Sequence, residues 1–213
     1  SLAHNGVLFL DEFPEFPRTV LDSLRQPIEK GSILISRSSS HVTYPARFQL
    51  IAAMNPCRCG YLSDKELGCG RAPRCAIDYQ MKISGPLLDR IDIHVDVQAI
   101  NISEIDDITT GEDTQTIKNR VENARMIQKE RYKSINIKTN SELDGKLLTE
   151  LTLTDHDVKS IINDAAEKMK LTMRAYNRIL KVARTIADMN NSENVQKEHV
   201  KEAIIYRPTY LKK

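Results

Sequence analysis

The chain has 213 residues, of which 40% are hydrophobic and 28% charged; this is typical of one large or two small globular domains and excludes wholesale disorder, a collagen-like repeat or a coiled-coil rod. Its formal net charge of +2, from 31 basic and 29 acidic residues, does not by itself indicate a nucleic-acid partner. No apolar run reaches the roughly 20 residues of a membrane helix, and no secretory signal is visible, so we expect a cytoplasmic protein.

A continuous apolar run at residues 6–10 predicts a strand of the kind found in parallel sheets that are covered on both faces. Such a strand needs parallel neighbours, and too few strands follow to complete a sheet. We therefore expect the chain to begin inside a domain of a longer protein. A proline-punctuated loop at 13–17 then leads to a helix over 18–30, which Pro27 weakens in its last turn and Gly31 ends.

A β-hairpin is predicted after this helix, because two short β-type runs at 33–37 and 41–44 flank a polar tip of serines. A second buried-type strand covers 48–54, and a loop rich in Cys, Gly and Arg covers 56–76. The elements expected next are a short helix over 76–83, a turn at 85–86 and a third apolar strand over 91–97.

From about residue 102 the sequence changes to helical periodicity. Helices are predicted near 114–132, 143–150, 155–170, 172–189 and 196–206. Asp155 and Thr172 are candidate N-caps for two of them. The expected fold is therefore an α/β part, residues 1–100, followed by an all-helical part, residues 101–213.

The acidic pair Asp11-Glu12 follows the first predicted strand directly. In open α/β sheets, ligands bind at the carboxyl edge, where these carboxylates would lie. The first acid could hold the Mg²⁺ of a nucleotide, usually through water, and the second could activate a water for attack on the γ-phosphate. The alternative is a buried strand followed by a charged loop.

Three further polar residues are candidate nucleotide contacts. Asn55 ends the second strand at the same edge, where it could orient the attacking water or simply start an Asn-Pro turn. Arg90 precedes the third strand and could act as an arginine finger, or pair with Asp89 or Asp92 on the surface. Arg174, early in its helix, could contact the γ-phosphate from a helical lid or belong to a solvated basic face.

The four cysteines are clustered, at Cys57, Cys59, Cys69 and Cys75. Without an export signal, such a cluster indicates a metal or reduced thiols rather than disulfides. Four soft ligands suit tetrahedral Zn²⁺, although their spacing departs from the paired Cys-x₂₋₄-Cys pattern of structural sites. The alternative is a reduced loop whose cysteines partly pack.

Basic residues outnumber acidic residues by eight to three between residues 30 and 82. Clusters of this kind bind phosphates in a salt-dependent manner. Arg37 and His41, beside the serines of the predicted hairpin, are the candidate DNA contacts. Because few aromatic residues interleave with the basic ones, base stacking is a minor expectation. The alternative is an ordinary solvated surface.

The order of these motifs resembles that of the AAA+ ATPases: a strand with an acidic pair, a helix and hairpin, a strand ending in Asn, a Leu-Leu-Asp-Arg segment, and a helical domain with an early Arg. The helix and hairpin between Glu12 and Asn55 resemble the clade of magnesium chelatase and the MCM helicases. Nearly the whole chain resembles the magnesium-chelatase-like ComM/YifB proteins of bacteria, above all residues 1–31, 35–61, 83–95 and 174–189.

This resemblance implies that Asp11 and Glu12 are the Walker B pair, Asn55 is sensor 1, Arg90 is the arginine finger and Arg174 is sensor 2. It implies a partial AAA+ parallel-sheet core with a pre-sensor-1 β-hairpin, which in related motors projects into a central pore, followed by a helical lid domain. The family is described as hexameric ATPases that use ATP and Mg²⁺ to drive branch migration of recombining DNA, single-stranded or branched, in natural transformation.

One departure from the family pattern concerns the phosphate-binding loop. The chain has no Gly-x-x-x-x-Gly-Lys-[Ser/Thr] motif, since its only Gly-Lys pair, Gly145-Lys146, is followed by Leu147 and lacks the upstream glycine. In the family this loop lies N-terminal to the residue that matches Ser1. We therefore expect the chain to be the C-terminal part of the enzyme, and to bind ATP weakly or not at all without hydrolysing it.

The leading interpretation is thus part of a ring-forming AAA+ ATPase, or helicase-like motor, that acts on DNA. A chelatase-type motor for metal insertion into a tetrapyrrole shares the ATPase parts and differs in its partners. A third interpretation is a non-catalytic zinc module that binds nucleic acid, which the ordered motif set disfavours.

Overall fold

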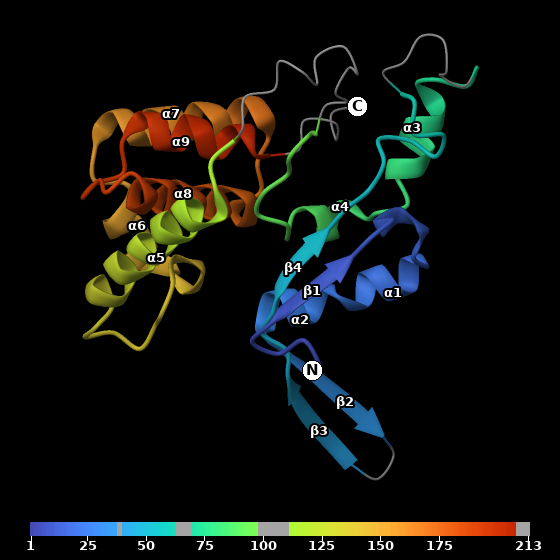
Figure 1. The fold of residues 1–213 in the computed structure, drawn as a ribbon, viewed down its shortest axis with the longest axis horizontal. Helices are drawn as coiled ribbons and strands as arrows, with labels where there is room; N and C mark the ends of the chain where they lie inside the picture. Colours follow the sequence, from blue (N-terminus) through green and yellow to red (C-terminus); the bar gives the residue numbers. More distant parts are fainter. Residues whose placement is uncertain (38–39, 63–69, 98–110, 208–213) are drawn as a thin grey trace. The chain divides into compact units, whose positions relative to one another are not determined.

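In the computed structural model the described residues are 1–37, 40–62, 70–97 and 111–207 (Figure 1). Their contacts divide the chain into two compact units, Ser1–Ile91 and Asp92–Lys213. The boundary predicted near residue 100 lies outside the described residues. Among the residues that are described, no helix is long and apolar enough to cross a membrane.

The first unit contains a parallel pair of strands, β1 (Val7–Leu10) and β4 (Gln49–Ala52), with Leu10 opposite Ala52. Figure 1 shows the two arrows side by side and pointing the same way. Both predicted strands and their parallel direction are confirmed. The expectation that they are covered on both faces is not met within the described residues, because Phe9 is more than half exposed.

Short helical elements follow β1: η1 (Phe13–Glu15), α1 (Arg18–Ser23) and α2 (Arg25–Lys30). The single helix predicted over 18–30 is therefore wrong, because the helix divides at Leu24. Pro27 explains the division: it has no N–H to donate to the carbonyl of Ser23, and its ring would clash with that carbonyl. Gly31 ends α2 as predicted, with φ 64° and its N–H donating to Pro27 O at 2.9 Å.

The predicted hairpin is confirmed as the antiparallel strands β2 (Ser32–Arg37) and β3 (Ser40–Pro45). Figure 1 shows it projecting away from the β1–β4 sheet. The chain enters the hairpin at Gly31, where a Cβ atom would lie 2.8 Å from Cγ of Arg47. Several large apolar side chains of the hairpin are exposed: Leu34, Ile35, Val42 and Tyr44.

The first unit ends with α3 (Arg74–Gln80) and α4 (Gly85–Leu88), and α4 replaces the simple turn expected at 85–86. The strand predicted over 91–97 is wrong, since these residues form no strand. A strand needs a neighbouring backbone to pair with, and the N–H of His94 instead donates to the carbonyl of Tyr206 at 2.9 Å.

A small apolar core holds the first unit together. It joins η1 and α1 to α4 through buried side chains, namely Phe13, Leu21, Ile83, Leu87 and Leu88. A polar bond adds to this contact, because the hydroxyl of Ser84 donates to Oδ1 of Asp22 at 2.6 Å. The segment after β1 is thereby fixed on the rest of the unit.

The second unit is helical, as predicted. Its elements are α5 (Thr114–Arg131), η3 (Asn140–Glu142), α6 (Gly145–Thr152), α7 (His156–Met169), α8 (Met173–Met189) and α9 (Lys197–Ile205). Both predicted caps are confirmed: the side chain of Asp155 accepts from the N–H of Asp157 at 3.1 Å, and that of Thr172 from the N–H of Ala175 at 3.1 Å.

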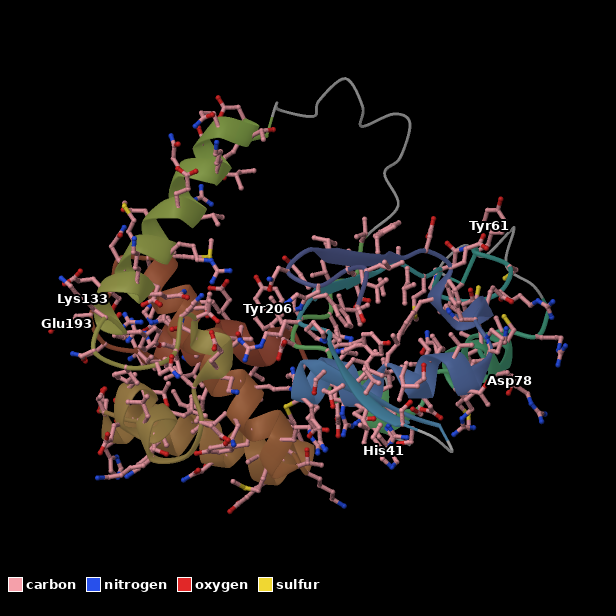
Figure 2. The ribbon with its side chains drawn as sticks, turned by 90° about the horizontal axis from the view of Figure 1, so that it is seen from below. His41, Tyr61, Asp78, Lys133, Glu193 and Tyr206 are labelled. Atoms are coloured by element: carbon pink, nitrogen blue, oxygen red, sulfur yellow. The ribbon has the colours of Figure 1, made fainter. Side chains whose placement is uncertain are left out.

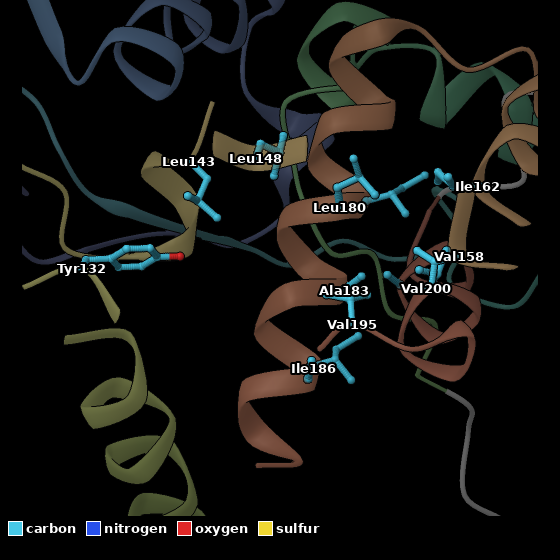
Figure 3. Packing of buried hydrophobic residues seen from close by; sticks show 13 residues of the cluster. Tyr132, Leu143, Leu148, Val158, Ile162, Leu180, Ala183, Ile186, Val195 and Val200 are labelled. Atoms are coloured by element: carbon cyan, nitrogen blue, oxygen red, sulfur yellow. The ribbon is translucent and has the colours of Figure 1, made fainter. Parts of the chain in front are cut away.

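Helix α8 is the centre of this unit and contacts α5, α6 and α9. Its apolar face is buried, with Leu180 and Ala183 almost fully covered. Figure 3 shows this face together with Val158 of α7 and Val200 of α9. Because α8 packs against several helices, its buried side chains form the centre of the unit's hydrophobic core.

A buried polar network, which the sequence analysis missed, ties α5 to α8. The carboxylate of Asp188 is fully buried and accepts from Arg131 at 2.9 and 2.5 Å and from Arg184 at 2.9 Å. The amide of Asn140 donates to the same carboxylate at 2.8 Å. The hydrogen bonds and ion pairs of the network offset the free-energy cost of burying one anion and two cations.

Candidate functional site

The carboxyl ends of β1 and β4 bring the predicted acidic pair and Asn55 to one edge of the sheet. Asp11 and Glu12 follow β1, and Asn55 comes three residues after Ala52 at the end of β4. Backbone bonds hold the two segments together beyond the strands, because Ala53 donates to Leu10 O and accepts from the N–H of Phe13, each at 2.9 Å. The predicted juxtaposition therefore exists in the fold.

Glu12 has a left-handed backbone, with φ 49° and ψ 43°. For a residue with a side chain this conformation costs about 1–2 kcal/mol. The N–H of Glu12 donates to Oδ1 of Asp11 at 2.8 Å, and the next residue, Phe13, is anchored in the core. The fold thus imposes a strained backbone at the residue predicted to activate water, a kind of strain that clusters at functional sites.

The surroundings of the acidic pair are carboxylate-rich and open to water. Asp11, Glu12 and Glu15 are exposed and line a shallow hollow together with Phe16 and Pro17. Exposed carboxylates suit Mg²⁺, which keeps several of its water ligands when it binds to proteins. The residues present therefore fit a hydrated Mg²⁺ ion that accompanies a nucleotide.

The hydroxyl of Tyr79, on α3, is influenced by the charges of the same carboxylates. Burial raises the pKa of its hydroxyl, and the negative charges of Glu15 and Glu12 raise that pKa further. Its ring is also 5.2 Å from the Nζ atom of Lys82, which pairs with Glu15 at 3.2 Å. Sequence reasoning gave no signal for Tyr79, because its proximity to the acidic pair depends on the packing of α3.

Arg90 is held inside its own unit rather than projecting freely. Its Nη2 and Nε atoms donate to Glu29 of α2 at 2.5 and 3.1 Å, and its Nη1 atom donates to Pro86 O at 2.6 Å. The side chain is 10% exposed. Neither Asp89 nor Asp92, the acids considered from the sequence, accepts these bonds. The partner Glu29 lies 61 residues away along the chain.

Arg174 lies in the first turn of α8, in the second unit, and is exposed. The basic face predicted around it is only partly solvated. Arg178, one turn later, pairs with Asp92 and its side chain is 16% exposed. Burial lowers the pKa of Lys181, whose Nζ atom donates to Ser141 O at 3.0 Å. Within this face, Arg174 therefore differs from Arg178 in facing solvent.

The hairpin carries the candidate DNA contacts. His41 is exposed on β3, as Figure 2 shows, and its Nδ1 atom lies 2.9 Å from Oγ of Ser36. The backbone of Arg37 ends β2 opposite Ser40. The register therefore places both predicted residues near the tip of the hairpin.

Three of the four predicted metal ligands come together. The sulfur atoms of Cys57, Cys59 and Cys75 all lie within 4.8 Å of one another. Cys69 lies outside the described residues. The cluster is separate in sequence from the acidic pair, and its first cysteine, Cys57, comes two residues after Asn55.

Comparisons with known proteins agree with the resemblance drawn from the motifs. Residues 1–105 match the family model described as magnesium chelatase, subunit ChlI, and residues 111–207 match the model of the C-terminal part of that subunit. Among relatives, YifB of Salmonella typhimurium and the competence protein ComM of Haemophilus influenzae are each 41% identical over 97% of this chain.

The chain spans 40% of the length of each of these two relatives. A more distant relative is the maternal DNA replication licensing factor mcm6 of Xenopus tropicalis, which is 24% identical over 95% of this chain and 24% of its own length. Because the two family models together cover almost the entire sequence, this chain belongs to the magnesium-chelatase-like family of the ComM and YifB proteins.

Proposed function

We propose that this chain forms the Walker B, sensor and lid portion of an Mg²⁺-dependent AAA+ ATPase that remodels DNA. The parallel pairing of β1 with β4 carries the proposal, because it brings Asp11, Glu12 and Asn55 to one edge of the sheet. Family membership supports an ATPase, and relatives named for competence and for DNA replication support DNA as the substrate.

In the proposed reaction each of the three residues at the sheet edge has a different role. Glu12 accepts a proton from the water that attacks the γ-phosphate, and Asn55 orients that water. Asp11 would hold the hydrated Mg²⁺ ion of the nucleotide. The metal ion, when bound, neutralises charge on the phosphates.

The two arginines are proposed to stabilise charge that develops on the transferred phosphate. Arg174 would act from the lid, and Arg90 would act on the nucleotide of a neighbouring subunit in a ring, which we expect to be a hexamer. For Arg90 this role requires its bonds to Glu29 to open, since that carboxylate now holds two of its nitrogen atoms.

The hairpin is proposed to transmit ATP-driven motion to DNA. It projects from the sheet that carries the acidic pair, and the 30–82 segment has an excess of basic residues. Arg37 and His41 would contact the phosphate backbone. Such a motor would work in the cytoplasm, the compartment predicted from the sequence, and branch migration during natural transformation is the proposed process.

The test is the steady-state ATPase activity of the longer protein, because these 213 residues contain no phosphate-binding-loop motif. Activity is measured alone and with single-stranded, duplex and branched DNA. We expect DNA to stimulate turnover, and Glu12→Gln to reduce it by about 10²–10⁴-fold while ATP binding is retained.

Glu15→Gln is the matched control for this test. Glu15 has the same side chain, lies three residues further along and borders the same hollow, but no catalytic role is assigned to it. Its exposed ion pair with Lys82 contributes little to stability. Retained turnover in Glu12→Gln, or equal losses in the two variants, would contradict the assignment of Glu12.

A chelatase-type motor is the second candidate, because the matched family models are those of a magnesium chelatase subunit. ATPase activity that is indifferent to every DNA and stimulated by a tetrapyrrole with its metal would favour it. An ATPase-inactive longer protein with bound zinc would instead favour the third interpretation, a non-catalytic module that binds nucleic acid.

A further inference from the structure

The turn that follows β4 and the first turn of α3 together bring three cysteines into one cluster. The sulfur atoms of Cys57 and Cys59 are 3.1 Å apart, and all three sulfurs, that of Cys75 included, lie within 4.8 Å of one another. In a tetrahedral site with Zn–S bonds of about 2.3 Å, sulfur atoms are about 3.8 Å apart. The separation of 3.1 Å and the limit of 4.8 Å each lie within about 1 Å of this value, so small side-chain movements would accommodate an ion.

Local backbone structure produces this cluster. The N–H of Gly60 donates to Cys57 O at 3.1 Å, which closes a tight turn and directs two sulfurs to the same place. Gly60 has φ 84°, a conformation that glycine adopts at no steric cost. Cys75 arrives from the first turn of α3, and this helix is tied to the loop because Gln80 donates to Pro56 O at 2.9 Å.

The loop has little apolar material that could hold it in place. Among the described residues from 53 to 73, Cys57 alone is buried, and its side chain is fully covered. Figure 2 shows Tyr61 in this loop and Asp78 on α3, both at the surface. Since so few of the described residues here are buried, apolar packing does little to hold them in place. Structural metal ions stabilise small domains that lack a sufficient core.

We propose that Cys57, Cys59 and Cys75 bind a thiophilic divalent metal ion, with zinc as the expected occupant. Thiolates select zinc over the hard cation Mg²⁺, so this site is chemically distinct from the one at Asp11. Exposed cationic side chains flank the cysteines in sequence, at Arg58 and Arg74, and would offset the negative charge of several thiolates around one ion.

The predicted role of the ion is structural: it joins the start of α3 to the turn that follows Asn55. The proposal is confined to the three described thiolates, which leave one position of a tetrahedral ion for a further ligand. It does not depend on ATPase activity or on DNA binding, so its failure would leave the proposed function untouched.

The test measures metal content and a thiolate signature on the full 213-residue chain, purified without chelator. Inductively coupled plasma mass spectrometry should show stoichiometric zinc, and replacement by Co²⁺ should give a sulfur-to-cobalt charge-transfer band. Cys59→Ser and Cys75→Ser should lose both signals. Met81→Ser is the matched control, since Met81 is an exposed sulfur-containing residue just after α3 and should keep both.

Circular dichroism, compared with that of the unmodified chain, would show whether the variants keep the helices of the first unit, which contains all three cysteines. If a cysteine variant does not fold, the cobalt spectrum of the unmodified chain decides the question by itself. A chain that takes up neither zinc nor cobalt, or whose Cys57 and Cys59 are joined by a disulfide under reducing purification, would overturn the proposal. Metal retained at full stoichiometry in folded Cys59→Ser and Cys75→Ser would overturn it as well.

Discussion

The buried carboxylate of Asp188 should be one of the most costly side chains to remove from the helical unit. In Asp188→Ala, two cationic side chains lose their anion: that of Arg184, which is 2% exposed, and that of Arg131, which is 17% exposed. Removing one partner of a buried ion pair costs about 3–5 kcal/mol. This is a large fraction of the roughly 5–15 kcal/mol by which domains are stable.

Urea unfolding followed by circular dichroism measures this loss. With a denaturant dependence of about 1–3 kcal/mol per molar, a loss near 4 kcal/mol lowers the midpoint by about 1–4 M. Asp164→Ala is the control, because Asp164 is an exposed aspartate on α7 and its removal should change stability by at most about 0.5 kcal/mol. Equal midpoints for the two variants would refute the reasoning.

The same network predicts how stability depends on pH. Burial alone would raise the pKa of Asp188, but hydrogen bonds from Arg131 and Asn140 and the charges of Arg184 and Arg131 lower it overall. A folded-state pKa below the unfolded value of about 3.9 stabilises the fold above that pH. The contribution is lost as the pH falls through the folded-state pKa, so Asp188→Asn should flatten the acid limb of the stability profile.

Three further outcomes are expected. Gly31→Ala should destabilise the first unit by about 1–2 kcal/mol because its φ is 64°, whereas Gly85→Ala, with no atom within 4 Å of the added Cβ, should not; equal urea midpoints would contradict this. In the longer protein, Arg90→Ala should lower ATPase turnover by about 10³–10⁵-fold. Glu29→Gln, which changes the ion-pair partner of Arg90, should not lower it. Equal losses of turnover in the two variants would mean that the pair is only structural. His41→Ala should weaken stimulation by DNA, without changing turnover in its absence; unchanged stimulation would remove the hairpin histidine from the DNA contacts.

Local chemistry along the chain was enough to predict much of the fold. The apolar runs before Asp11 and Asn55 predicted strands whose carboxyl ends meet, and the structure pairs them in parallel. The caps at Asp155 and Thr172 were predictable because an N-cap bond spans only two or three residues. The hairpin and the helices of the second unit were predictable because hydrophobic periodicity, like an N-cap, is a property of residues that are close in sequence.

Tertiary structure alone determined which residues that are distant in sequence contact one another. The alternating apolar pattern at 91–97 predicted a strand, but such a pattern does not show whether a neighbouring backbone is present to pair with it. In the structure these residues form no strand. The pairing of Arg90 with Glu29 and the burial of Asp188 between two arginines likewise depend on which helices pack together. Residue type and spacing determined which side chains could carry chemistry, and packing determined which of them meet.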